Sequence, residues 1–412
     1  MCQFHARVNQ VSPSHRAPSK MDIPPEVLHL VGQYFRYRRC HQILVCCRVS
    51  KGWYAAFIPL LLHTLEFTIL GEYSREKLPS PNVLHRHGNL VRNVTLEYYN
   101  FDRLSAGDLL AGVAMVKFLS LSFYPRDWRW LRQFVANNPG IHKLQLNNHG
   151  AVGNFSYLKD LAEVAPQVQD FSLADANVEW LTLLHFLTVC QQLLKVRLQS
   201  SKVVYTRSQG IPSIGDATLS QSVQTLEFEY LRGLTFSSCL DLAARCPRLE
   251  SLEFSQAEGD TTLPFGFGDL SKIKHCTSLS TLSLVSHSLS SLQLADILGH
   301  CQTLTSLILK TDLNLESIAG MTHHLRSLET LDLSRCSFGM FEAILSQCPK
   351  LTNFTIALNG ILDIGQAPFD CDGRLANTPR PWLCVGLKKL KIRSNIERLC
   401  RLWDTLANRL WG

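Results

Sequence analysis

A short apolar pattern recurs along most of the 412-residue chain and limits the folds that the chain can adopt. The pattern is apolar-x-x-apolar-x-apolar, and its middle positions lie mostly 23 to 30 residues apart. These middle positions are Val94, Leu119, Leu144, Phe171, Val196, Leu226, Leu252, Leu282, Leu307, Leu331, Phe354 and Leu390. One such triplet means little in a leucine-rich chain, but about twelve in phase indicate a repeat array.

The spacing within each triplet predicts the local structure. Its last two apolar residues are two apart, so both point to the same side of a short strand while the residue between them points the other way. Helix-like stretches lie between the triplets, for example 184–194, 239–246 and 341–347. A unit of strand and helix this small cannot bury its own apolar face, so neighbouring units must stack. We therefore expect parallel strands on the inner face of a solenoid and helices on its outer face.

Six of the fourteen cysteines occupy one position of the repeat, three residues before its first leucine. They are Cys190, Cys246, Cys276, Cys301, Cys348 and Cys384. Asn138 and Ala165 hold the same position in other repeats, which favours a small buried residue over a redox or metal role. The chain contains no CxxC pair, so zinc-ribbon and thioredoxin-type sites have no support.

Segments such as RCPRLESLEF at 245–254 and QCPKLTNFTI at 347–356 resemble the cysteine-containing leucine-rich-repeat family. The resemblance covers residues 88–395, with about twelve repeats. It implies an α/β fold of horseshoe form, with parallel strands on the concave face and helices on the convex face.

A second module, over residues 21–70, precedes the repeats and is predicted to be all-α. Apolar residues at helical spacing favour helices over 24–35, 42–56 and 59–65. The order of its residues, Ile23-Pro24, Glu26-Val27-Leu28, Val31, Phe35, Leu44, Val49 and Trp53, resembles the F-box family. The chain departs from that pattern at 36–41, which is strongly basic, and at His63, where the family commonly has tryptophan.

The F-box resemblance implies a function without covalent chemistry. The chain would be the substrate-recognition subunit of a Skp–cullin–F-box ubiquitin ligase, with a Skp-type adaptor, and through it a cullin–RING ligase, as partner. The expected adaptor-binding residues are Ile23, Pro24, Val27, Leu28, Val31, Phe35, Leu44, Val49 and Trp53. Some of these must instead hold the module together, and the sequence does not separate the two sets. The alternative is a leucine-rich-repeat interaction scaffold without a ligase role.

The residues between and beside the repeat leucines are the candidates for binding a target protein on the concave face. They are Lys143, Gln145, Asn147, Arg197, Gln199, Glu227, Glu229, Glu253, Ser255, Lys310, Asp332, Ser334, Lys391 and Arg393. Polar insertions at 199–222 and 357–386 break the period and could be binding loops or tolerated ones.

Charge and motifs argue against other functions. The net charge of +7 comes from the ends, because residues 1–20 and 371–412 are basic while the rest is close to neutral. This distribution makes nucleic-acid binding an unfavoured hypothesis. No P-loop, HExxH, EF-hand or dinucleotide motif occurs, so we expect no enzyme activity, cofactor, bound metal or small-molecule substrate.

The ends of the chain carry the remaining expectations. Residues 1–20 lack the apolar segment of a secretory signal, so they are expected to form a disordered basic leader, and 396–412 a basic cap. Translation could start at Met1 or Met21. A cytoplasmic or nuclear protein without membrane association is the expectation.

Overall fold

The computed structural model describes most of the repeat region and part of the N-terminal module. The described residues are 23–24, 26–28, 30–31, 43, 45–69, 81–98, 110–122, 129–148, 157–204, 221–234, 236–256, 270–285, 291–310, 324–333, 344–357, 384 and 386–393. The leader, the C-terminal cap, most of both insertions, Phe35, Leu44 and Ser334 lie outside them. The chain divides into two compact units, Met1–Thr64 and Leu65–Gly412, which we call unit 1 and unit 2.

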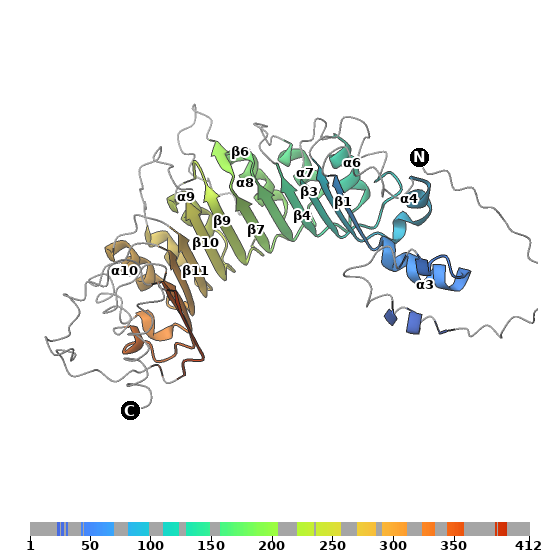
Figure 1. The fold of residues 1–412 in the computed structure, drawn as a ribbon. Helices are drawn as coiled ribbons and strands as arrows, with labels where there is room; N and C mark the ends of the chain where they lie inside the picture. Colours follow the sequence, from blue (N-terminus) through green and yellow to red (C-terminus); the bar gives the residue numbers. More distant parts are fainter. Residues whose placement is uncertain are drawn as a thin grey trace, which may run out of the picture. The chain divides into compact units, whose positions relative to one another are not determined.

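Unit 2 is built on one long parallel sheet whose strands follow one another in chain order (Figure 1). The sheet has 13 strands. They are β1 (Thr64–Ile69), β2 (Asn93–Tyr98), β3 (Phe118–Ser122), β4 (Lys143–Asn147), β5 (Asp170–Ala174), β7 (Lys195–Gln199), β9 (Thr225–Leu231), β10 (Ser251–Gln256), β11 (Thr281–Val285), β12 (Ser306–Lys310), β13 (Thr330–Leu333), β14 (Asn353–Ala357) and β15 (Lys389–Arg393).

The register of this sheet confirms the repeat that the sequence predicts. All twelve middle positions, from Val94 to Leu390, are direct partners of one another across neighbouring strands. The fold is therefore a leucine-rich-repeat solenoid. The repeat pattern does not predict β1, because the TLEFTI segment at Thr64–Ile69 falls within residues 21–70, which the sequence assigns to the helical module.

Helices lie along one side of the sheet (Figure 1). They are α4 (Pro81–His87), α6 (Arg129–Asn137), α7 (Leu158–Val164), α8 (Trp180–Val189), α9 (Phe236–Ala243) and α10 (Ser291–His300). In two other repeats the described residues form short 3-10 helices at this position, η2 (Leu270–His275) and η3 (His324–Ser327), while a further one, η1 (Gly88–Leu90), directly follows α4 in the same repeat. The helix predicted at 184–194 begins earlier, at Trp180, and ends at Val189.

The apolar side chains of the strands form the core by packing on these helices. The Phe171 ring of β5 lies 4.3 Å from the Phe186 ring of α8, measured between centroids. The Phe254 ring of β10 lies 5.2 Å from the Phe236 ring of α9. The alternating buried and half-buried pattern of β3, β4, β5 and β7 shows that the intervening residues face away from this core.

The repeated cysteine position is buried, as predicted. All six cysteines are buried and free. In each case the backbone N–H of the first repeat leucine donates to the cysteine carbonyl, for example Leu193 to Cys190 at 3.2 Å. Burial raises the pKa of Cys190, Cys246, Cys301 and Cys348 to about 12 and that of Cys276 to about 11. These thiols therefore serve packing and stay protonated at neutral pH.

Three consecutive repeats carry a second, smaller sheet beyond the ends of their main strands. It pairs β6 (Asn177–Glu179) with β8 (Lys202–Val204), and Lys202 bridges to Arg232 in the next repeat. The chain turns into it through Asp175, Ser200 and Tyr230, which adopt left-handed φ angles of 52°, 48° and 52°. Gly233, with φ of +76°, completes the turn in the last of the three repeats.

Unit 1 contains one long helix and shorter helical segments around a small core. Helix α3 (Lys51–Leu62) begins at Ser50, whose hydroxyl accepts a hydrogen bond from Trp53 N at 3.2 Å. The segment predicted as one helix over 42–56 is interrupted by a turn at Cys47–Val49. Helix α3 then runs through Pro59 into the third predicted segment. His63 N donates to the Pro59 carbonyl, while Pro59 has no N–H to donate to the carbonyl four residues earlier, so the helix continues with one hydrogen bond fewer.

Candidate protein-binding surfaces

The first candidate surface is the side of the main sheet that carries no helices. We call it the open face and define it by the strand residues that alternate with the buried ones. Every predicted target-binding residue with a described side chain belongs to a strand of this sheet, and all but Ser255 are partly or fully exposed. Arg393 lies in β15. Lys195 also belongs to the open face, since it precedes Arg197 by two residues; the same period-two rule would have identified it.

Charged residues of the open face are arranged as ion pairs between neighbouring strands. Lys195 Nζ lies 2.6 Å from Glu227 Oε1, and Arg197 Nη2 lies 2.6 Å from Glu229 Oε1. Arg197 Nε is a further 3.5 Å from Glu227 Oε2. Nearer the start of the sheet, Lys143 Nζ lies 2.9 Å from Asp170 Oδ2 and 5.6 Å from the centre of the Phe118 ring. The register that aligns the leucines therefore also aligns opposite charges.

Glu253, on β10, differs from these paired residues. No ion pair joins it to another described residue, although it is half-buried. Burial and the nearby carboxylates of Glu229 and Glu227 raise the pKa of Glu253, while Lys310 and Arg197 act to lower it. The open face thus has a local excess of negative charge at β9 and β10.

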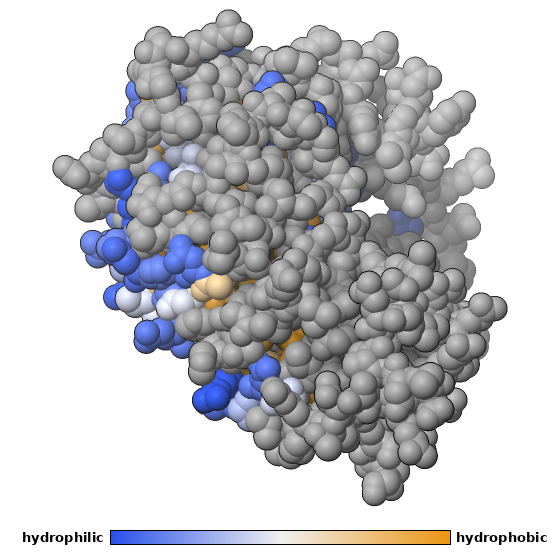
Figure 2. All heavy atoms as spheres, turned by 90° about the vertical axis from the view of Figure 1, so that its left-hand side faces the viewer, coloured by the Kyte–Doolittle hydropathy of each residue, from blue (hydrophilic) through white to orange (hydrophobic). Residues whose placement is uncertain are grey.

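The described surface is mainly hydrophilic on the side shown in Figure 2, with apolar atoms confined to small patches. No group of three or more His, Cys, Asp or Glu among the described residues could hold a metal ion. No helix in the described part of the chain is long and apolar enough to cross a membrane.

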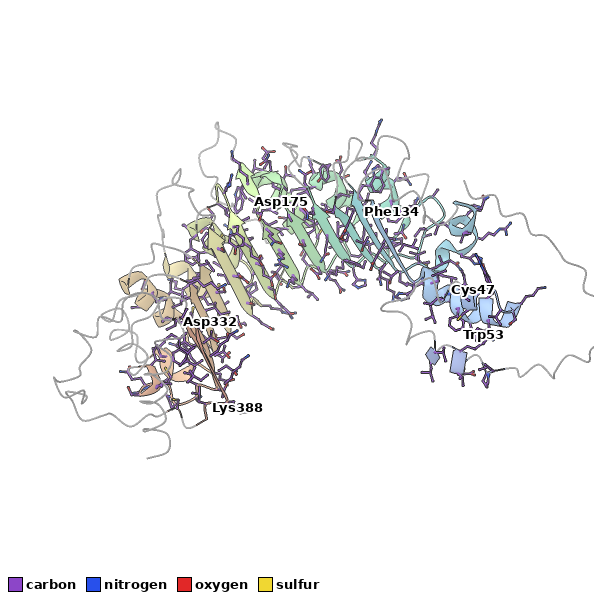
Figure 3. All side chains as sticks on the ribbon, viewed as in Figure 1. Cys47, Trp53, Phe134, Asp175, Asp332 and Lys388 are labelled. Carbon is purple, nitrogen blue, oxygen red and sulfur yellow. The ribbon has the colours of Figure 1, made fainter. Side chains whose placement is uncertain are left out.

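The second candidate surface is apolar and lies on unit 1. The predicted adaptor-binding set divides into buried and exposed members. Leu28 belongs to the small core, with Ile43 and Phe57. Trp53 packs against this core and stacks on Phe57 with ring centroids 5.6 Å apart. Cys47 packs against the same core and lies near Trp53 in Figure 3.

The other described members of that set are exposed. We define the apolar surface of unit 1 by its exposed apolar side chains Ile23, Val27, Leu30, Val31, Val45 and Val49, which are 38–65% exposed. Leu30 and Val45 were absent from the predicted set. Leu30 precedes Val31 and Val45 follows Leu44 in the sequence. An apolar residue type does not by itself show whether its side chain is exposed or buried. Pro24 is exposed and its carbonyl accepts from Val27 N and Leu28 N, so it starts the helical turn.

Comparisons with known proteins add little to this geometry. No protein-family model and no curated protein sequence matches the chain. Among solved structures, a chain from a crystal structure of a TLR13–ssRNA13 complex is similar, with 16% sequence identity and a TM-score of 0.44. The match covers 74% of this chain and 43% of that chain, so this chain spans less than half of that protein's length. The assignment to the leucine-rich-repeat fold rests on the in-register sheet.

Proposed function

We propose that this chain is the substrate-recognition subunit of a Skp–cullin–F-box type ubiquitin ligase. In this proposal unit 1 docks on a Skp-type adaptor and the open face of unit 2 binds the target protein. The observation that carries the proposal is the division of unit 1 into a buried apolar set and a separate exposed apolar set, in a segment whose sequence resembles the F-box family.

The exposed apolar side chains of unit 1 favour a binding partner that covers them. Six aliphatic side chains within residues 23–49 are 38–65% exposed, which is costly in water and is relieved when a partner covers them. None of the six builds the core around Leu28, Ile43 and Phe57. A partner with an apolar groove, as the F-box resemblance implies for the adaptor, fits this composition.

The open face supports the second half of the proposal. Many of its residues are charged or polar, and the hydrogen-bonded sheet fixes their positions, so the open face suits a protein surface of complementary charge. The chain itself would contribute proximity and orientation to ubiquitin transfer and no covalent step.

Co-purification of the full chain with a Skp-type adaptor tests the proposal. The double variant Val27→Glu/Val49→Glu places charges on the apolar surface of unit 1 and should abolish adaptor binding while its circular dichroism spectrum stays unchanged. Met115→Glu is the matched control, because Met115 is a 53% exposed apolar residue of unit 2. It should bind the adaptor like the parent chain.

The same experiment separates the two functions that the sequence leaves open. A parent chain that does not bind the adaptor would overturn the ligase role and leave an interaction scaffold. Equal binding by the parent and the double variant would show that the adaptor contacts some other part of the chain.

A further inference from the structure

Three carboxylates lie side by side on the open face of β9 and β10. Glu227 and Glu253 are direct partners in the register of these strands, and Glu229 follows two residues after Glu227 on the same face. Neighbouring strands are about 4.8 Å apart, so Glu227 and Glu253 repel each other unless cations lie between them.

The described cations that form ion pairs with this cluster lie on its β7 side. Lys195 and Arg197 belong to β7, and both reach toward β9, where they contact Glu227 and Glu229. On the other side, β11 presents Ser283 opposite Glu253 and Val285 opposite Ser255, and neither carries charge. Lys310 is one strand further along, at the end of β12, opposite Val285. Glu253 therefore forms no ion pair with another described residue, although Lys310 and Arg197 act from a longer range to lower its pKa.

A buried hydroxyl group beside Glu253 also lacks a partner. Ser255 follows Glu253 by two residues on β10. Glu253 pairs with Ser283 and Ser255 with Val285 of β11, so strand alternation places both on the open face, although the register to β9 shifts after Phe254. Ser255 is only 2% exposed, and its Oγ forms no hydrogen bond within the described part of the chain. Buried hydroxyl groups are normally satisfied, so this one indicates a position where a bound group would complete the hydrogen bonding.

We propose that Glu229, Glu253 and Ser255 form a subsite for a basic side chain, preferably arginine, of the protein bound to the open face. This inference rests on the proposed function, because it assumes that the open face binds a protein. A guanidinium group presents five N–H donors in a planar fork. It donates to both carboxylates and to the Ser255 hydroxyl, and it supplies a paired positive charge for Glu253, which forms no ion pair with another described residue.

The structure favours an organic cation over a metal ion. Among the described residues no three carboxylate, histidine or cysteine side chains are close enough to hold a metal. A guanidinium spans the gap between adjacent strands, which a single metal ion with ligand distances near 2–2.5 Å does not. Charge-assisted hydrogen bonds to carboxylates that are already half-buried are also stronger than those on an open surface.

Fluorescence anisotropy with two labelled peptides tests the subsite on the full chain. One peptide alternates glycine and arginine, and the other replaces each arginine with uncharged citrulline of the same shape. We expect the parent chain to bind the arginine peptide at least about fivefold more tightly than the citrulline peptide. Glu253→Gln should remove most of this preference, and Ser255→Ala should reduce it.

The matched control is Glu163→Gln, which removes one negative charge from an exposed side chain of helix α7, outside the open face. It should keep the preference for arginine. Equal binding of both peptides by the parent chain, or an unchanged preference in Glu253→Gln, would overturn the subsite. The circular dichroism spectrum of Glu253→Gln should match that of the parent chain, which excludes a folding defect as the cause of weaker binding.

The outcome can be distinguished from failure of the proposed function. The peptide assay contains no adaptor, so loss of the ligase role would leave its result unchanged. Proximity labelling in cells that express either the parent chain or Glu253→Gln then identifies the proteins that bind each form. A partner captured equally by both forms would contradict the subsite, whereas capture that survives multiple open-face substitutions would contradict target binding by this face.

Discussion

Asn138 donates a hydrogen bond from its Nδ2 to the carbonyl of Val113, 3.0 Å away and one repeat earlier in the chain. The same amide donates to Phe134 O at 2.9 Å, and its Oδ1 accepts from Val116 N at 3.0 Å. Asn138 is fully buried and occupies the position that cysteine holds in six later repeats. It therefore ties two successive repeats together with hydrogen bonds that a thiol only partly replaces.

Replacing Asn138 with alanine should lower the free energy of unfolding by about 3 kcal/mol. The change leaves backbone groups of Val113 and Val116 buried without a partner, each costing roughly 1–3 kcal/mol. Urea unfolding followed by circular dichroism measures the loss. Asn137→Ala is the matched control, because Asn137 is exposed and bonds only Gln133 among the described residues; it should change stability by about 0.5 kcal/mol or less. Similar losses in both variants would contradict this account.

The buried cysteines should make stability fall at high pH. Burial raises the pKa of Cys190, Cys246, Cys301 and Cys348 from the ordinary thiol value of 9.0 to about 12. Their contribution is fully present below pH about 9 and is lost as the pH rises toward 12, since the unfolded chain ionises first. Urea midpoints between pH 8 and 10.5 should decline, and the decline should be smaller in Cys190→Ala/Cys348→Ala. A flat profile in the parent chain would count against burial of these thiols.

The same cysteines should resist alkylation in the folded protein. The thiolate is the reactive form, so peptide-resolved mass spectrometry after iodoacetamide at pH 8 should find them unmodified without urea and modified with it. Modification of Cys190 in the folded state at the rate seen in urea would show that it is accessible.

Gly233→Ala should be strongly destabilising, by about 2–4 kcal/mol. Gly233 has a φ of +76°, and a Cβ at this position would lie 2.2 Å from the Val203 carbonyl oxygen. Gly386→Ala offers the contrast, because a Cβ there meets no atom within 4 Å. Thermal unfolding should show a clear drop in Tm for the first variant and little change for the second. Equal Tm values would mean that the second sheet at β6 and β8 shifts without cost.

Glu253→Gln should stabilise the unbound protein at neutral pH. Burial and the neighbouring carboxylates raise the pKa of Glu253, so its ionisation disfavours the folded state once the pH exceeds the pKa of the unfolded chain. The gain should therefore appear at pH 7 and vanish near pH 3, where the carboxyl is protonated in both states. Urea midpoints of the parent and the variant at the two pH values measure it; a gain at pH 3 as large as at pH 7 would contradict the electrostatic cause.

The repeat itself could be predicted from the sequence because its period is simple. Apolar residues at fixed spacing, such as Leu144 and Leu146, identify both the strand and the face that it buries. The first strand was missed since Leu65, Phe67 and Ile69 follow an apolar helix without a turn signal. The end of α3 shows the same difficulty: Pro59 marks a boundary in sequence, yet the helix passes through it.

The candidate sites were harder to predict because they depend on contacts between repeats. The sequence places Arg197, Glu227 and Glu253 on one face. It does not show that Arg197 forms an ion pair with Glu227 and none with Glu253. In unit 1, apolar residues at helical spacing did not reveal that Leu28 is buried while Val27 is exposed. Such distinctions arise from which residues of distant segments meet, for example Leu28 with Phe57.

The connections between strands vary in length, while the pairing of the middle repeat positions stays the same from strand to strand. Leu331 and Phe354 are partners, and so are Phe354 and Leu390, although the second pair is separated by the longer connection. A gain or loss of residues between strands therefore leaves every open-face side chain on its own side of the sheet. The chain can lengthen its loops over evolutionary time and acquire new binding partners there, while the surface already built on the strands is inherited intact.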